Sequence, residues 1–200
     1  MALDRLLSFI VGTIDARTPA FLTMERKMIK ELRDQVVGEL ADLCGKLLWE
    51  SGRGRFIQWF YFGGRKIVTT FAGNQKETGE YSLEISCIWR ISTSRDIIVA
   101  SGDLYVPRDG AQAPGQDFDC LNPGVSLSDA KMEGFIRHEC PLRVEGAEAN
   151  NVGGFRLMLQ RGFFLDVFPD YSTDDEHWRL VKPGDDPPHI ILSGKGLEEQ

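Results

Sequence analysis

The residues best suited to chemistry lie in an acidic loop that follows an expected β-strand and ends at a histidine. Two nearby carboxylates can act as general acid and base, or hold a hard cation such as Ca²⁺. The spacing of these acids matches no EF-hand loop, and an acidic turn is usually solvated. A catalytic or cation site and a solvated, partner-facing edge therefore both stay open. The residues are Asp166, Asp170, Asp174, Asp175, Glu176 and His177.

Two Trp-Arg pairs form a second chemical pattern, Trp89–Arg90 and Trp178–Arg179. Neighbouring side chains on a strand point to opposite faces, so the two members of a pair do not stack on each other. We expect each Trp in the core and each Arg paired with an acid across the sheet. The alternative is an arginine that grips an anionic ligand. A pocket of that kind would be lined by Trp89, Arg90, Asp103, Asp170, Trp178 and Arg179.

The soft metal ligands are scattered along the chain. None of the cysteines forms a C-x-x-C pair; they are Cys44, Cys87, Cys120 and Cys140. Cys87 and the segment His138–Cys140 could bind zinc, but no pair has ligand spacing. No motif of a nucleophilic cysteine surrounds any of the four. We therefore predict reduced thiols, no metal site, no cofactor and no catalytic residue.

Composition narrows the class of partner. The 200 residues include 23 basic and 30 acidic ones, a net charge of −7. A nonspecific nucleic-acid binder needs a cationic face, so the charge argues against one. This balance suits a basic protein partner. The glycine-bearing turns Ser51–Arg55 and Gly63–Lys66 lack the strand-to-helix setting of a phosphate loop. The aromatic run Phe56–Phe62 is typical of a core strand, with a base-stacking platform as the alternative.

No segment of the sequence predicts membrane insertion. The apolar stretch Leu6–Ile14 is about half the ~20 residues that a spanning helix needs. No clear cleavage site for a signal peptide follows it. We expect a cytoplasmic protein without a membrane partner.

Periodicity predicts one long helix and a series of strands. Apolar residues recur every three or four positions from Thr23 to Glu50, which predicts an amphipathic helix. A hairpin is expected at Gly63–Gly64, and a short helix from Asp129 to about His138 with Ser128 as its cap. The end of the chain, residues 194–200, is expected to fray. The predicted strands are 56–62, 66–72, 81–91, 97–106, 141–148, 155–159, 163–168, 177–181 and 189–192.

These elements predict an α+β fold, in which one long amphipathic helix packs on a mostly antiparallel, meandering sheet of about seven to nine strands. The length favours one domain over residues 1–200. Within it, residues 1–52 would be mainly helical and 53–194 rich in strands. A long surface loop is expected at 107–127, and loops of that size are often functional.

A scattered pattern of residues resembles a group of small, uncharacterised bacterial proteins over roughly residues 45–195. No activity is established for that group. Some of its members look like the immunity proteins of bacterial toxin systems, which are small, acidic, non-enzymatic and bind a toxin. The pattern runs through Leu48-Trp49-Glu50-Ser51-x-Arg53, Phe60-Tyr61-Phe62-Gly63, Trp89-Arg90-Ile91, Gly102-Asp103-Leu104-Tyr105, Gly153-Gly154, Phe168-Pro169-Asp170 and Glu176-x-Trp178-Arg179.

Three functions remain as hypotheses. The first is a non-enzymatic cytoplasmic binding protein, such as an immunity-type inhibitor of a basic bacterial toxin. The second is a small-molecule binder or enzyme that uses the Trp, Arg and Asp pocket. The third is a structural homo-oligomer, such as a dimer formed through an exposed sheet edge. For the first, the partner-binding residues would be Asp170, Asp174, Asp175 and Glu176, with Asp117 and Asp119 as second choice.

Overall fold

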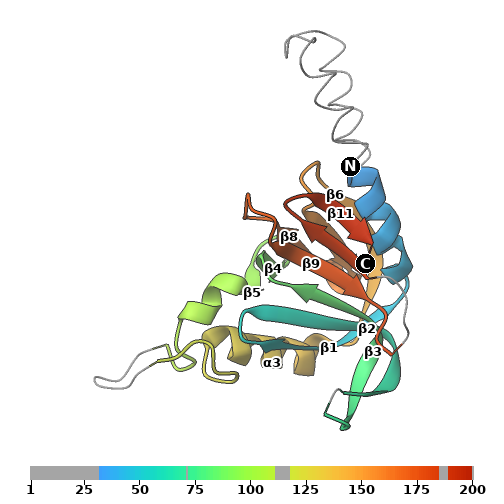
Figure 1. Cartoon of the computed structure of the whole chain (residues 1–200). Helices are drawn as coiled ribbons and strands as arrows, with labels where there is room; N and C mark the ends of the chain where they lie inside the picture. The colour runs from blue at the N-terminus through green and yellow to red at the C-terminus, as the bar shows by residue number, and fades with distance from the viewer. Residues whose placement is uncertain (1–31, 71, 111–117, 185–188, 200) are drawn as a thin grey trace, which may run out of the picture.

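The computed structural model describes residues 32–70, 72–110, 118–184 and 189–199. Eleven strands in this part of the chain form one antiparallel sheet, in the order β11-β10-β9-β3-β2-β1-β6-β7-β8-β4-β5 (Figure 1). The strands are β1 (Leu47–Gly54), β2 (Ile57–Thr69), β3 (Gln75–Ile85), β4 (Ile88–Ser92), β5 (Ile97–Ala100), β6 (Leu142–Ala149), β7 (Phe155–Leu159), β8 (Phe163–Phe168), β9 (Glu176–Val181), β10 (Ile190–Ser193) and β11 (Gly196–Glu199).

The sheet curls on itself, so that strands far apart in its order face each other across one core. The ring of Phe60 on β2 meets Trp89 on β4 edge-on, with the ring centroids 5.7 Å apart. Phe155 on β7 meets Trp178 on β9 in the same way at 5.2 Å. Both tryptophans are buried, as the sequence predicted for the Trp of each Trp-Arg pair. One hydrophobic cluster therefore joins the two halves of the curled sheet.

The predicted long helix from Thr23 to Glu50 is wrong. In the described residues the helix ends at residue 40, and the 3₁₀ turn η1 (Ala41–Leu43) and β1 follow. Gly45 has a φ of 82°, the left-handed conformation that ends helices. Past the helix the same spacing reaches Leu43, which is buried in η1, and Leu47, which is 36% exposed in β1. Residues 1–31 lie outside the described part of the chain.

The predicted fold class is also wrong, because it depended on that long helix. The described residues form mostly an antiparallel sheet of eleven strands with short helices, not one long helix on seven to nine strands. The described residues contain a helical stretch at 32–40 and the longer helix α3 (Leu127–Glu139). α3 packs against β1, β5 and the 3₁₀ turn η2 (Ser101–Tyr105). Figure 1 shows α3 below the sheet and the helical stretch at 32–40 (blue) at the far end of the molecule.

The hairpin predicted at Gly63–Gly64 is also wrong. β2 runs through both glycines for 13 residues, and its register with β3 shifts between Phe62 and Arg65. Gly63 has a φ of 77°, which suits a β-bulge. A glycine pair marks a bulge as readily as a turn, so the sequence alone did not separate the two. The return strand is β3, which begins at Gln75.

The strand predicted over Tyr81–Ile91 is divided at Ser86 and Cys87, where the chain passes from one half of the sheet to the other. The backbone N–H groups of Ser86 and Cys87 donate to the carbonyl oxygen of His177 on β9, at 2.9 and 3.2 Å. We call residues 86–88 the corner. Leu83, Ile85 and Cys87, which alternate along this segment, are buried.

The strand predicted over Ile97–Val106 ends early, at Ala100. The next five residues form η2, and the Asp103 carboxylate accepts a hydrogen bond from the Ala100 N–H at 3.0 Å. A short acidic side chain that captures a nearby N–H favours a turn over a continuing strand. The second half of the predicted strand is therefore a 3₁₀ turn.

The C-terminal half follows the sequence more closely. β7 and β8 have the predicted bounds, and the intervening 3₁₀ turn η3 (Gln160–Gly162) lies where a turn was predicted. α3 is confirmed with an earlier cap, because the Ser126 side chain accepts from the Asp129 N–H. Residues Gly196–Glu199 form β11 and pair with β10, where fraying was predicted. In the described ranges, no helix is long and apolar enough to cross a bilayer.

Candidate functional site

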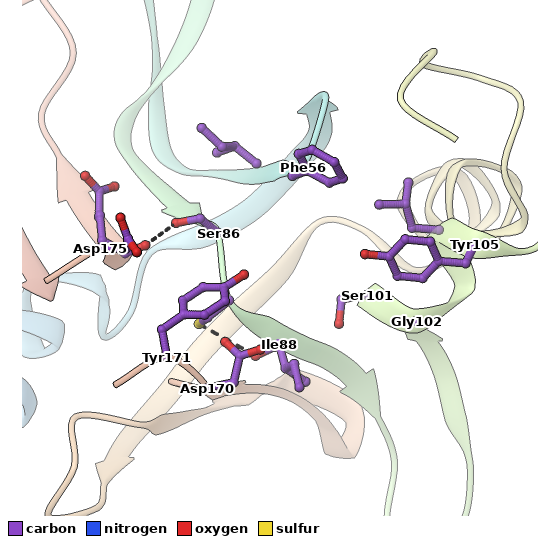
Figure 2. Close-up of a pocket in the computed structure, with 13 residues that line it drawn as sticks. Phe56, Ser86, Ile88, Ser101, Gly102, Tyr105, Asp170, Tyr171 and Asp175 are labelled. Carbon is purple, nitrogen blue, oxygen red and sulfur yellow. Dashed lines mark hydrogen bonds between the residues drawn. The ribbon is translucent and has the colours of Figure 1, made fainter. Parts of the chain in front are cut away.

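An open cleft of about 880 Å³ lies where four segments meet. These segments are the β1–β2 turn, the corner, η2 and the loop between β8 and β9. Figure 2 shows the rings of Phe56, Tyr105 and Tyr171 around the cleft, with Ser86 and Ile88 between them. The antiparallel pairing of β3 with β9 and of β4 with β8 brings the corner and the β8–β9 loop together.

The walls of the cleft carry large apolar side chains that face solvent. Tyr105 is 66% exposed and Phe56 is 55% exposed, and Tyr171, Ile88 and Ile57 are exposed as well. Such residues are common singly on a surface, but a contiguous group marks an interaction site. Tyrosine and phenylalanine also supply large contact area at low entropic cost.

Acidic side chains line the same cleft without a basic one. Asp170, Asp175 and Glu176 are among its lining residues, and no Lys, Arg or His is. Glu176 accepts a hydrogen bond from Arg179 Nε at 2.7 Å, and Asp175 accepts one from the Thr173 hydroxyl. No ion pair joins Asp170 or Asp175 to a cation within the described ranges. The cleft is therefore apolar with a negative potential.

A thiol, a carboxylate and an imidazole come together at one end of the cleft. Ligand atoms of Cys87, Asp170 and His177 all lie within 4.8 Å of one another. Burial raises the pKa of Cys87 to about 12, and the Asp170 charge adds to the rise. The thiol is thus protonated at neutral pH and a poor nucleophile in this state. The His177 ring is buried and stacks on Tyr171, with centroids 5.6 Å apart and planes inclined by 9°.

The structure brings together three of the acids predicted to bind a partner. Asp170, Asp175 and Glu176 all line the cleft, whereas Asp174 lies outside it and pairs with Lys195 at 2.9 Å. Asp119 is exposed and accepts from the Leu121 N–H at 3.0 Å, away from the cleft. Asp117 lies outside the described residues.

The predicted Trp, Arg and Asp pocket is not assembled. Trp89 and Trp178 are in the core, so neither faces a ligand. Arg179 pairs with Glu84 and Glu176 on the face of β3 and β9. Asp103 pairs with Lys131 of α3 at 3.1 Å.

Arg90 belongs to a separate group on β4, β7 and β8. Its Nε lies 3.0 Å from an oxygen of the buried Asp166, and Arg156 holds the other oxygen at 2.6 Å. Burial raises the pKa of Asp166, but the two guanidinium groups outweigh it and lower that pKa below its ordinary range. Asp166 is thereby satisfied as a structural ion pair, so it is not available as a general base.

Sequence reasoning missed the apolar wall and the partners of Cys87. Phe56 and Tyr105 were assigned to strands, because neither the β1–β2 turn nor η2 was predicted. Cys87 was considered with His138–Cys140, whereas the fold sets it beside Asp170 and His177. The useful signal was the acidic loop itself, which ends at His177 and whose strands were predicted correctly.

Comparison with models of protein families, with curated proteins and with solved structures found no match to this chain.

Proposed function

We propose that the chain is a non-enzymatic binding protein whose cleft takes a basic polypeptide segment that also carries apolar side chains. The observation that carries the proposal is the composition of the cleft, which combines exposed rings with three carboxylates and no cationic side chain. A cationic segment is attracted to that potential, and its apolar side chains cover the exposed rings. Immunity-type inhibition of a basic toxin is one form of this function.

Three further features support a partner of this chemistry. The net charge of −7 attracts a basic protein over a distance of about one Debye length. The volume of about 880 Å³ is at the upper end of ligand cavities and suits several side chains at once. The cysteines of the described residues are free, which is consistent with the reducing cytoplasm that we propose as its compartment.

The test uses synthetic peptides labelled with a fluorophore and measures their binding by fluorescence anisotropy. One peptide alternates Arg or Lys with Leu and Trp, a second replaces the basic residues with Glu, and a third replaces the apolar residues with Ser. We expect only the first to bind, with an affinity that falls steeply between 50 mM and 500 mM salt. Equal binding of the acidic peptide would contradict the proposal.

Two variants locate the binding to the cleft. Asp175→Lys reverses one charge and Tyr105→Ala removes one ring, so each is expected to weaken binding by about tenfold or more. The matched controls are Asp96→Lys, at the far end of the β4–β5 hairpin, and Ile67→Ala, at the far end of the β2–β3 hairpin. Both control residues are exposed and lie outside the cleft. If the controls weaken binding as much as the cleft variants, the cleft is not the site.

A further inference from the structure

Cys87, Asp170 and His177 form a cluster, and the partner-binding proposal uses only the carboxylate of Asp170. Cys87 lies in the corner, Asp170 follows the end of β8, and His177 is the second residue of β9. Their ligand atoms lie within 4.8 Å of one another. The two backbone hydrogen bonds from the corner to the His177 carbonyl fix the corner against β9. Cys87 and His177 are therefore held in place by the sheet, and Asp170 lies beside them at the start of the β8–β9 loop.

The imidazole of His177 has unused bonding capacity. The residue is only 2% exposed, and its Nδ1 is buried with no hydrogen-bond partner. A buried polar atom without a partner costs about 1–3 kcal/mol, so proteins rarely keep one without a role. The stacked Tyr171 ring restricts rotation of the imidazole. A bound ion would offer this ring the missing partner.

The donor atoms identify the class of ion. A thiolate sulfur and an imidazole nitrogen are soft or borderline ligands, which favour Zn²⁺ and its neighbours over Mg²⁺ or Ca²⁺. With Zn–S near 2.3 Å and Zn–N and Zn–O near 2.1 Å, tetrahedral ligands are roughly 3.4–3.6 Å apart. The ligand atoms lie within 4.8 Å of one another, so the cluster would have to contract by up to about 1.4 Å. Asp170 is exposed and lies at the start of a loop, so its side chain can supply that movement.

We propose that Cys87, Asp170 and His177 bind one zinc-class divalent cation at the end of the cleft. Three protein ligands leave the fourth tetrahedral position for water or for a donor atom of a bound partner. Cys87 and Asp170 both line the cleft, so that position faces it. On binding, the thiol releases its proton to solvent, because the thiolate is the ligand. The ion also ties the acidic loop to the corner.

The test measures Zn²⁺ binding to the full chain after removal of metals with a chelator. Calorimetry is expected to show one equivalent of Zn²⁺, and Co²⁺ is expected to give the near-ultraviolet absorption of a cobalt–thiolate bond. Cys87→Ser should abolish that absorption and weaken Zn²⁺ binding by more than about 100-fold, since changes at residues that only support the ligands already cost 10–100-fold. The matched control is Cys140→Ser, a half-buried thiol outside the cluster.

A second variant keeps the test decisive if Cys87→Ser does not fold. Asp170→Asn changes an exposed side chain and should weaken Zn²⁺ binding by about tenfold or more, with the unfolding curve of the metal-free protein unchanged. The proposal is overturned if no saturable Zn²⁺ binding occurs, or if Asp170→Asn binds like the wild type. It is also overturned if the cobalt–thiolate absorption depends on Cys140. The peptide-binding measurement is to be made on the same metal-free chain, so that the failure of one proposal is distinguishable from the failure of the other.

Discussion

Asp129 is the residue on which the start of α3 depends. Its two oxygens accept from Arg53 Nε at 2.6 Å and Arg53 Nη2 at 2.8 Å. The same carboxylate accepts from the N–H and hydroxyl of Ser126, the cap residue of the helix. The side chains of Arg53 and Asp129 are only 5% and 13% exposed. The pair therefore joins β1 to α3 in a region shielded from water, where loss of one partner leaves an unpaired buried charge.

This environment makes stability depend on pH. Burial raises the pKa of Asp129, but hydrogen bonds from Arg53 and Ser126 outweigh it and bring that pKa from 3.8 to about 2. The folded-state pKa lies below the unfolded one, so the stabilisation is fully present above about pH 4 and is lost as the pH falls towards 2. A shift of this size is worth about 2 kcal/mol. When the pH is lowered from about 4 to 2, we expect the free energy of unfolding to fall by about 2 kcal/mol more in the wild type than in Asp129→Asn. Urea titrations at each pH measure this difference. Parallel curves for the two proteins would contradict it.

At the scale of the element, the turn between β10 and β11 positions the acidic loop. A Cβ on Gly194 would lie 1.8 Å from the carbonyl oxygen of Thr173, which shows how closely this turn approaches the loop. Lys195 of the same turn pairs with Asp174. The β10–β11 turn thus contacts the loop that supplies Asp170 and Asp175 to the cleft, although no residue of that turn lines the cleft.

Gly194→Ala is therefore expected to displace the loop. The added methyl group cannot be accommodated by rotating a side chain, because the obstacle is backbone, and such overpacking costs about 1–3 kcal/mol. Hydrogen exchange should become faster at the amides of residues 171–176, and urea unfolding should occur at lower concentration. The control is Gly134→Ala in α3, where no atom lies within 4 Å of the new methyl group and helix propensity predicts a gain of about 1 kcal/mol. Unchanged exchange in the loop of Gly194→Ala would contradict this role.

The elements that the sequence predicted well are those specified by local signals. β7 and β8 are short, mostly apolar runs separated by the three residues Gln160–Gly162, and Ser126 to Glu139 carries a cap and a helical pattern. The elements that it missed depend on distant residues. Gly63–Gly64 continues a strand because β3 pairs on both sides of it, and β1 forms because β2 and β6 flank it. Pairing of this kind is a tertiary effect that propensity does not encode.

In the candidate site, too, the residues that are close in sequence were predicted and those from distant segments were missed. Its carboxylates were predicted because Asp170, Asp175 and Glu176 are close together in the sequence. Its rings and its thiol were not, because Phe56, Cys87 and Tyr105 reach the cleft from three separate segments. Only the register of β3 with β9 and of β4 with β8 brings them to the acidic loop.

For the molecule as a whole, the curled sheet predicts a single cooperative unit. The hydrophobic cluster includes residues from both ends of the strand order, and the Phe60–Trp89 and Phe155–Trp178 contacts cross between the two halves. The expectation of one domain over the chain therefore leads to a specific prediction about unfolding.

Loss of buried volume in either half should destabilise both halves equally. Leu83 on β3 and Leu157 on β7 are fully buried, and each change to alanine is expected to cost about 2–5 kcal/mol. Far-ultraviolet circular dichroism and tryptophan fluorescence should follow one coincident transition in urea, shifted to lower concentration in each variant. Ile67→Ala, on the exposed end of the β2–β3 hairpin, should change the free energy of unfolding by no more than about 0.5 kcal/mol. Two separate transitions in Leu157→Ala would mean that the halves fold independently, and that the cleft lies between two units instead of within one.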